Sequence, residues 1–210
     1  MNISLIIRIT ILAVIFVLYV AVNVSSSKRK TGIKKTVAKT ILKGLCLIGA
    51  VAAAIIVVFN VVLMLNQIPS SYMGTTVMAG DLVISTRLDS KDIERYDIMV
   101  FRAPDDPDTY YIKRVIGLPG ETITVENGHV YADGVLLNDN FVNEEMDGSG
   151  DGIYEVPEGC YFMMGDNRNH SYDSRFWNGE DRYIPLEDFV AKAKVVVYPL
   201  NHFGSLGKEK

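Results

Sequence analysis

The chain has 210 residues, of which 49% are hydrophobic, and a formal net charge of −4 at pH 7. This length suits one ordinary domain with some attachments. The acidic balance argues against a nucleic-acid partner, because phosphate backbones attract basic surfaces. The cysteines, Cys46 and Cys160, lie in an apolar run and in a polar segment respectively, so we expect no disulfide between them and no metal site.

Two long apolar runs precede the polar part of the chain. Residues 3–24 and 41–65 contain only Arg8 and Lys43 as charged residues. Each run is long enough as a helix to cross a hydrocarbon core of roughly 30 Å. Two buried core helices are a poor alternative, because the remaining domain would have to cover helices that nearly equal it in apolar content. A cleaved signal peptide is also a poor alternative for the first run, because that run lacks the cleavage pattern. The sequence therefore predicts two transmembrane α-helices.

The loop between these runs, residues 25–40, is basic and has no acidic residue. Positively charged loops stay in the cytoplasm, so the two termini are expected outside. We therefore expect a two-pass protein of the cell membrane, with residues 1–66 as its anchor and residues 67–210 as an extracytoplasmic domain.

The outer domain consists of short apolar runs separated by Gly, Pro, Asn and Asp. β-Branched and aromatic residues fill these runs, which is typical of strands. Tight hairpin turns are predicted at Asn127-Gly128 and Asp133-Gly134. The expected domain is therefore mainly β, with strands within residues 81–86, 96–103, 109–117, 121–137, 160–165 and 190–200.

Lys113 is the first candidate for chemistry. It lies in a run in which alternate residues on both faces are largely apolar, with Tyr111 and Val115 on its own face. A lysine held in such a strand loses hydration, which lowers its pKa and lets the neutral amine accept a proton. The alternative is a lysine whose amine reaches solvent at the end of the strand.

Two further segments are rich in polar side chains. Residues 165–177 combine Asp, Asn, Arg and Ser, and we expect internal ion pairs of Asp173 with Arg175 or of Asp166 with Arg168. Such a segment can hold a hydroxyl in a fixed place. Residues 68–81 are uncharged until Asp81 and rich in hydroxyls, as expected of either a site at a membrane surface or a plain linker.

Together and in this order, the three segments resemble those of bacterial type I signal peptidases. The stretch from Tyr111 to Glu121 matches the lysine box of that family, and the stretch from Gly165 to Arg175 matches its Gly-Asp-Asn-Arg box. The resemblance extends from about the first apolar run to Pro199. It implies a β-rich domain docked on the membrane that removes signal peptides from exported preproteins, with neither cofactor nor metal.

Carried over residue by residue, the resemblance makes Lys113 the general base of a serine-lysine dyad. Ser171 would orient the lysine amine, and Ser70 would help to form the oxyanion hole. Asp173 and Arg175, with Asp166 and Arg168, would hold the loop together. The partners implied are exported preproteins, cleaved after small residues at the first and third positions before the cut, and membrane lipid.

The sequence departs from the family at the nucleophile. Counting back from Gly80, the serine position falls on Tyr72, and Thr75 replaces the usual proline. A phenol is not among the usual protease nucleophiles. Ser71 could serve if the loop slips by one residue, which corresponds to about 3.8 Å of backbone. Two functions therefore remain open: a peptidase that uses Ser71, or a non-catalytic chaperone-like relative, for example in pilus assembly.

One further pattern lies outside the resemblance. Residues from Asp147 to Glu158 fit the spacing of a calcium-binding loop, although Pro157 and a strand near Cys160 stand where the exiting helix should be. We expect a flexible polar turn here, with calcium binding as the alternative.

Overall fold

The computed structural model describes residues 32–74, 76–142 and 144–207. The chain divides into two compact units, Met1–Val62 and Leu63–Lys210. The predicted helix over residues 3–24 lies outside the described residues, so one of the two expected membrane helices is available for comparison.

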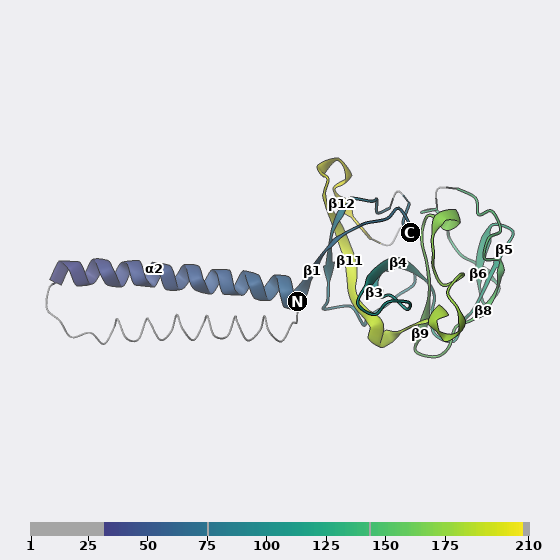
Figure 1. Cartoon of the computed structure of the whole chain (residues 1–210), viewed down its shortest axis with the longest axis horizontal. Helices are drawn as coiled ribbons and strands as arrows, with labels where there is room; N and C mark the ends of the chain where they lie inside the picture. The colour runs from purple at the N-terminus through teal and green to yellow at the C-terminus, as the bar shows by residue number, and fades with distance from the viewer. Residues whose placement is uncertain (1–31, 75, 143, 208–210) are drawn as a thin grey trace. The chain divides into compact units, whose positions relative to one another are not determined.

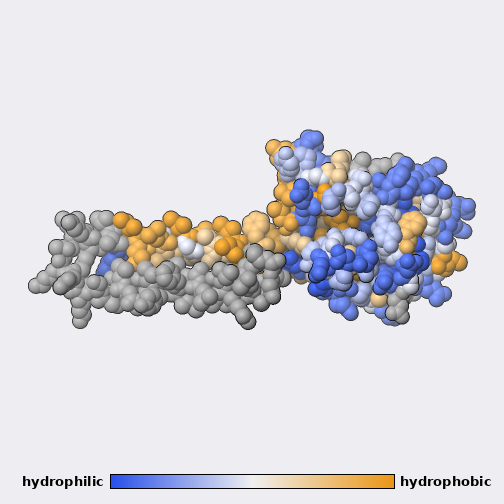
Figure 2. Space-filling view, viewed as in Figure 1, coloured by the Kyte–Doolittle hydropathy of each residue, from blue (hydrophilic) through white to orange (hydrophobic). Residues whose placement is uncertain are grey.

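The described part of the first unit is helical. Helix α2 spans Gly32–Val57 and continues as a π-helix, η1, over Val58–Val62. Its segment Lys39–Val57 has a mean hydropathy of 2.3, is long enough to cross a membrane, and has none of its apolar window buried. Figure 2 shows the apolar side chains along it. Among the described residues this is the single candidate membrane span.

The bounds of this helix differ from the prediction at both ends. Residues 32–40, predicted as loop, are already helical, which agrees with the good helix propensity of lysine. At the other end, residues 63–65 are not helical. They begin strand β1, Leu63–Gln67, which pairs with β2, Leu82–Thr86. An apolar run by itself does not distinguish a helix from a strand, and here strand pairing decides.

The second unit is built on a large antiparallel sheet with the order β1-β2-β11-β3-β4-β9-β10, in which β12 pairs with β11 (Figure 1). The remaining strands of this sheet are β3 (Ile98–Arg102), β4 (Tyr110–Gly117), β9 (Cys160–Met164), β10 (Ile184–Pro185), β11 (Phe189–Tyr198) and β12 (Gly204–Ser205). Short 3-10 turns lie at Arg168–His170, Gly179–Arg182, Leu186–Asp188 and Leu200–His202. The predicted mainly β domain is confirmed.

A smaller sheet has the order β7-β6-β5-β8. Its strands are β5 (Thr122–Glu126), β6 (His129–Ala132), β7 (Val135–Leu136) and β8 (Gly152–Glu155). Both predicted hairpin turns are present: Asn127 and Gly128 have φ of 49° and 81°, and Asp133 and Gly134 have φ of 50° and 78°. Positive φ at both central residues matches the twist of the flanking strands. Strand β8 was not predicted.

Strand β4 lies between β3 and β9 in the large sheet. Its residues from Lys113 to Gly117 are buried, so the prediction that both faces are covered is confirmed for this half of the strand. Val115 packs in a cluster with Met163 and Trp177. Ile116, which points to the other face, packs with the inner side of the smaller sheet. This double cover is what removes Lys113 from water.

Candidate active site

Lys113 lies opposite Met99 of the neighbouring strand β3, and its side chain is 1% exposed. The amine does not reach solvent at the strand end, which rules out that alternative. Its Nζ donates a hydrogen bond of 2.7 Å to Oγ of Ser171. The structure thus brings together two of the predicted site residues, which are far apart in the sequence.

Burial changes the acid-base character of this amine. Desolvation lowers the pKa of Lys113 from 10.5 to about 8, because the charged form loses its hydration. Nearby charges act less strongly and in opposite directions: Asp173 raises this pKa and Arg175 lowers it. Near pH 8 about half of the molecules therefore carry a neutral amine that can accept a proton.

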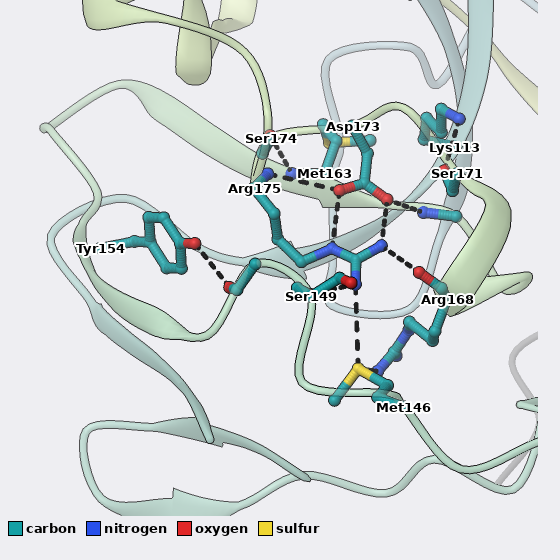
Figure 3. A network of polar contacts seen from close by, with 12 residues as sticks. Lys113, Met146, Ser149, Tyr154, Met163, Arg168, Ser171, Asp173, Ser174 and Arg175 are labelled. Atoms are coloured by element: carbon teal, nitrogen blue, oxygen red, sulfur yellow. Dashed lines mark hydrogen bonds and ion pairs between the residues drawn. The ribbon is translucent and has the colours of Figure 1, made fainter. Parts of the chain in front are cut away.

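Ser171 is held in place by an ion pair within its own loop (Figure 3). Both Asp173 and Arg175 are fully buried, and the guanidinium contacts the carboxylate through Nε and Nη2, each at 2.9 Å. Asp173 also accepts from the backbone N–H of Gly165 at 3.0 Å, and Arg175 donates to the carbonyl oxygen of Arg168 at 2.6 Å. The ion pair thus joins the start of the loop, at Gly165 and Arg168, to its end, and the predicted pairing of Asp173 with Arg175 is present.

The other predicted pair is wrong. Asp166 does not pair with Arg168 but with Arg114, through bonds of 2.8 and 2.6 Å between side chains that are 1% exposed. Arg168 pairs instead with Asp139 at 2.9 Å. Sequence proximity suggested Arg168, whereas the pairing of β4 with β9 places Arg114 opposite Met164, two residues before Asp166. A charged residue within an apolar strand needs a buried partner, and that was the available signal for Arg114.

The segment before β2 brings Tyr72 to the lysine. Nζ of Lys113 lies 4.2 Å from the centre of the Tyr72 ring, within the range of a cation–π contact. The backbone N–H of Asn167 donates to the Tyr72 carbonyl at 3.1 Å, and the Asn167 side chain donates to the Ser71 carbonyl at 3.1 Å. The two loops are therefore joined by hydrogen bonds from Asn167 to two consecutive backbone carbonyls.

Gly165 makes this close approach possible. A Cβ atom at this position would lie 2.2 Å from Oγ of Ser171 and 2.4 Å from the carbonyl oxygen of Tyr72. The second of these atoms belongs to backbone, which cannot turn aside as a flexible side chain could. The absence of a side chain at Gly165 thus determines the spacing between the Tyr72 segment and Ser171.

The two serines of the same segment, Ser70 and Ser71, were the predicted oxyanion donor and candidate nucleophile. Ser71 is exposed and Ser70 is half-buried, and within the described residues neither hydroxyl hydrogen-bonds Lys113. The side chain next to the amine from this segment is therefore Tyr72. Tyr72 itself is 38% exposed, so its ring covers the amine from the solvent side rather than filling a closed core.

No metal-binding group emerges from the described residues, among which no three His, Cys, Asp or Glu side chains gather. In the segment that fits the calcium-loop spacing, for which a polar turn was predicted, the Asp147 carboxylate accepts from the backbone N–H of Ser149 at 2.8 Å, and β8 intervenes before Glu158. This strand breaks the continuous loop that calcium binding would need. Both cysteines are free.

Comparison with known proteins assigns the chain to a family. The family described as signal peptidase, peptidase S26, matches residues 35–198. The chain is 36% identical to a signal peptidase I of Leptolyngbya laminosa, over 68% of this chain and 72% of the relative. It is 35% identical to signal peptidase I of Pseudomonas aeruginosa, over 58% of this chain and 57% of the relative.

A crystal structure of a signal peptidase I from Enterococcus faecalis is 28% identical, with a TM-score of 0.41, and covers 48% of this chain and 95% of that chain. The family match extends from within helix α2 to the end of β11, and it includes Lys113, Ser171 and the ion pairs around them. The chain belongs to the signal peptidase family, peptidase S26.

Proposed function

We propose that this chain is a membrane-bound serine endopeptidase that removes signal peptides from exported preproteins, with Lys113 as its general base. The observation that carries the proposal is the buried amine, which has a pKa near 8 and a hydrogen bond to Ser171. A domain that only bound peptides would have no chemical need for a buried lysine, which costs free energy when charged.

In the proposed reaction the neutral amine of Lys113 takes the proton of a serine hydroxyl, whose oxygen attacks the scissile carbonyl carbon. The ammonium then returns that proton to the leaving amine, and water hydrolyses the acyl-enzyme by the same base. Ser171 orients the amine throughout. The Ser70 hydroxyl donates a hydrogen bond to the oxyanion that forms on the carbonyl oxygen.

For the nucleophile we propose Ser71. The Tyr72 ring, which covers the amine in the peptide-free chain, has to move aside when substrate binds. A shift of one residue along the chain corresponds to about 3.8 Å, and the exposure of Tyr72 leaves room for its ring to turn outward. The hydrogen bonds from Asn167 to the carbonyls of Ser71 and Tyr72 would be remade in this step.

The proposal includes contact of the outer domain with membrane lipid. Apolar side chains are exposed on β1, on β11 and on the turn that follows it: Leu65, Tyr198, Leu200 and Phe203 are 50 to 80% exposed. Strands β1, β2, β11 and β12 are neighbours in one sheet. Exposed apolar groups collected on one part of a sheet favour contact with lipid.

A second candidate function follows from Tyr72. Because the phenol ring contacts Lys113 at the position of the family's serine, the chain could bind exported polypeptides without cutting them, as a chaperone or assembly factor would. In this case the lysine and Ser171 would be remnants of a former active site.

Three variants separate these two functions. The full chain in lipid nanodiscs is incubated with a preprotein that has alanine at the first and third positions before the cut, and products are identified by mass. We expect cleavage by the wild type, a loss of at least about 10²-fold in Ser71→Ala, and no loss in the exposed control Ser205→Ala. Full activity of Ser71→Ala would refute the proposed nucleophile. An inert wild type that becomes active as Tyr72→Ser would establish the second candidate.

A further inference from the structure

The outer face of the smaller sheet carries an apolar row that crosses all of its strands. Leu136 lies opposite Tyr131, Tyr131 opposite Thr124, and Thr124 opposite Ile153. Residues directly opposite one another on one face have Cβ atoms about 5 Å apart, so these side chains are neighbours. Leu136 is 56% exposed and Ile153 is 71% exposed, while Tyr131 and Thr124 are half-buried.

This row does not belong to the core of the domain. The alternate residues of the same strands, among them Ile123, Val130 and Tyr154, point inward and form the buried cluster beneath the sheet. The outer row is therefore an apolar surface in addition to a complete core. Within the described residues nothing covers it, and neither the buried lysine nor Ser171 lies in these strands.

Carboxylates flank the row on both sides. Glu126 follows Thr124 by two residues and therefore shares its face, and Glu155 stands in the same relation to Ile153. Asp133, in the turn between β6 and β7, accepts a hydrogen bond from the backbone N–H of Thr122. In the described structure none of these three carboxylates forms a salt bridge.

These carboxylates have few cations near them in the sequence, which has no Lys or Arg between Arg114 and Arg168. Acidic residues are frequent in that interval, and three of them are neutralised by arginines from outside it: Glu121 by Arg95, Asp139 by Arg168 and Asp166 by Arg114. None of the residues in these pairs belongs to the strands of the smaller sheet. The face is thus apolar in its middle and negative at its margins.

From this charge complementarity we infer that the outer face of β5 to β8 binds a basic polypeptide segment in which Lys or Arg residues flank a short apolar stretch. The apolar side chains would lie along the row of Leu136, Tyr131, Thr124 and Ile153. The cations would pair with Glu126, Glu155 and Asp133 at its margins. This inference does not depend on the proposed peptidase activity.

Other occupants fit this face less well. A second copy placed face to face would bring like charges together. Anionic lipid headgroups would be repelled for the same reason. A divalent cation needs ligands that converge on one point, and the described residues contain no such group.

The test uses the full chain in nanodiscs of uncharged lipid and a labelled peptide in which lysines flank a short run of valines, with binding measured by fluorescence anisotropy. We expect saturable binding that weakens as salt is raised. A peptide with glutamate in place of lysine should not bind. The variants Ile153→Ser and Glu155→Gln should each weaken binding several-fold, and together by about tenfold or more.

Leu88→Ser is the matched control, because Leu88 is 77% exposed and precedes β3 in the other sheet. It should bind the lysine peptide as the wild type does. The inference is overturned if the lysine peptide fails to bind, if the double variant binds as well as the wild type, or if the glutamate peptide binds equally. Loss of binding to anionic vesicles in the double variant, with peptide binding unchanged, would identify a lipid surface instead.

Discussion

Replacing Lys113 by alanine is expected to lower the rate of preprotein cleavage by at least about 10²- to 10⁴-fold, the usual contribution of a general base. The amine is buried and bonded to Ser171, and within the described part of the site no other side chain takes its place next to that hydroxyl. The rate is measured from the product formed by the full chain in nanodiscs at pH 8.

The fold should survive this substitution, because it removes a buried group that resists being charged. Circular dichroism and the midpoint of thermal unfolding test whether the variant keeps its fold. Lys194→Ala is the control: Lys194 pairs with Asp89 on the surface and should keep wild-type cleavage. Undiminished cleavage by Lys113→Ala would remove this lysine from the mechanism.

Asp166→Ala is expected to lower the free energy of unfolding by about 3–5 kcal/mol, because it leaves Arg114 charged and unpaired in the interior. Arg114 and Asp166 are each 1% exposed and are joined by two hydrogen bonds. Denaturant unfolding followed by fluorescence of Trp177, which is buried in the same domain, measures the change.

The matched control is Asp188→Ala, which removes a surface pair with Arg102. The side chain of Arg102 is 47% exposed and that of Asp188 is 35% exposed, so we expect the free energy of unfolding to fall by less than about 1 kcal/mol. Equal destabilisation by the two substitutions would mean that burial of the Arg114 pair contributes nothing specific to stability.

The fold was predictable wherever a local rule determined the structure. The turns at Asn127-Gly128 and Asp133-Gly134 require positive φ, which Asn-Gly and Asp-Gly sequences favour. The alternation around Lys113 predicted a strand buried on both faces. By contrast, Leu63–Gln67 forms a strand through its pairing with β2, a long-range contact that the composition of the segment does not encode.

The site was predictable where its contacts join residues that are close in sequence. Asp173 and Arg175 are near in sequence, and their pair was expected. The partner of Asp166 is Arg114, which approaches through strand pairing, so a local reading chose Arg168 instead. The contact of the Tyr72 ring with Lys113 depends on the close packing against Gly165, which only the folded chain reveals.

The proposed mechanism requires the amine of Lys113 to act in its neutral form. The most direct measurement is kcat/KM for preprotein cleavage by the wild-type chain between pH 6 and 10, over a range in which circular dichroism is constant. Because burial lowers the pKa of Lys113 to about 8, the neutral fraction grows as the pH rises. We expect about a tenfold increase in kcat/KM per pH unit below that value and a plateau above it. A rate that does not change from pH 6 to 10, or that falls through pH 8, would contradict it.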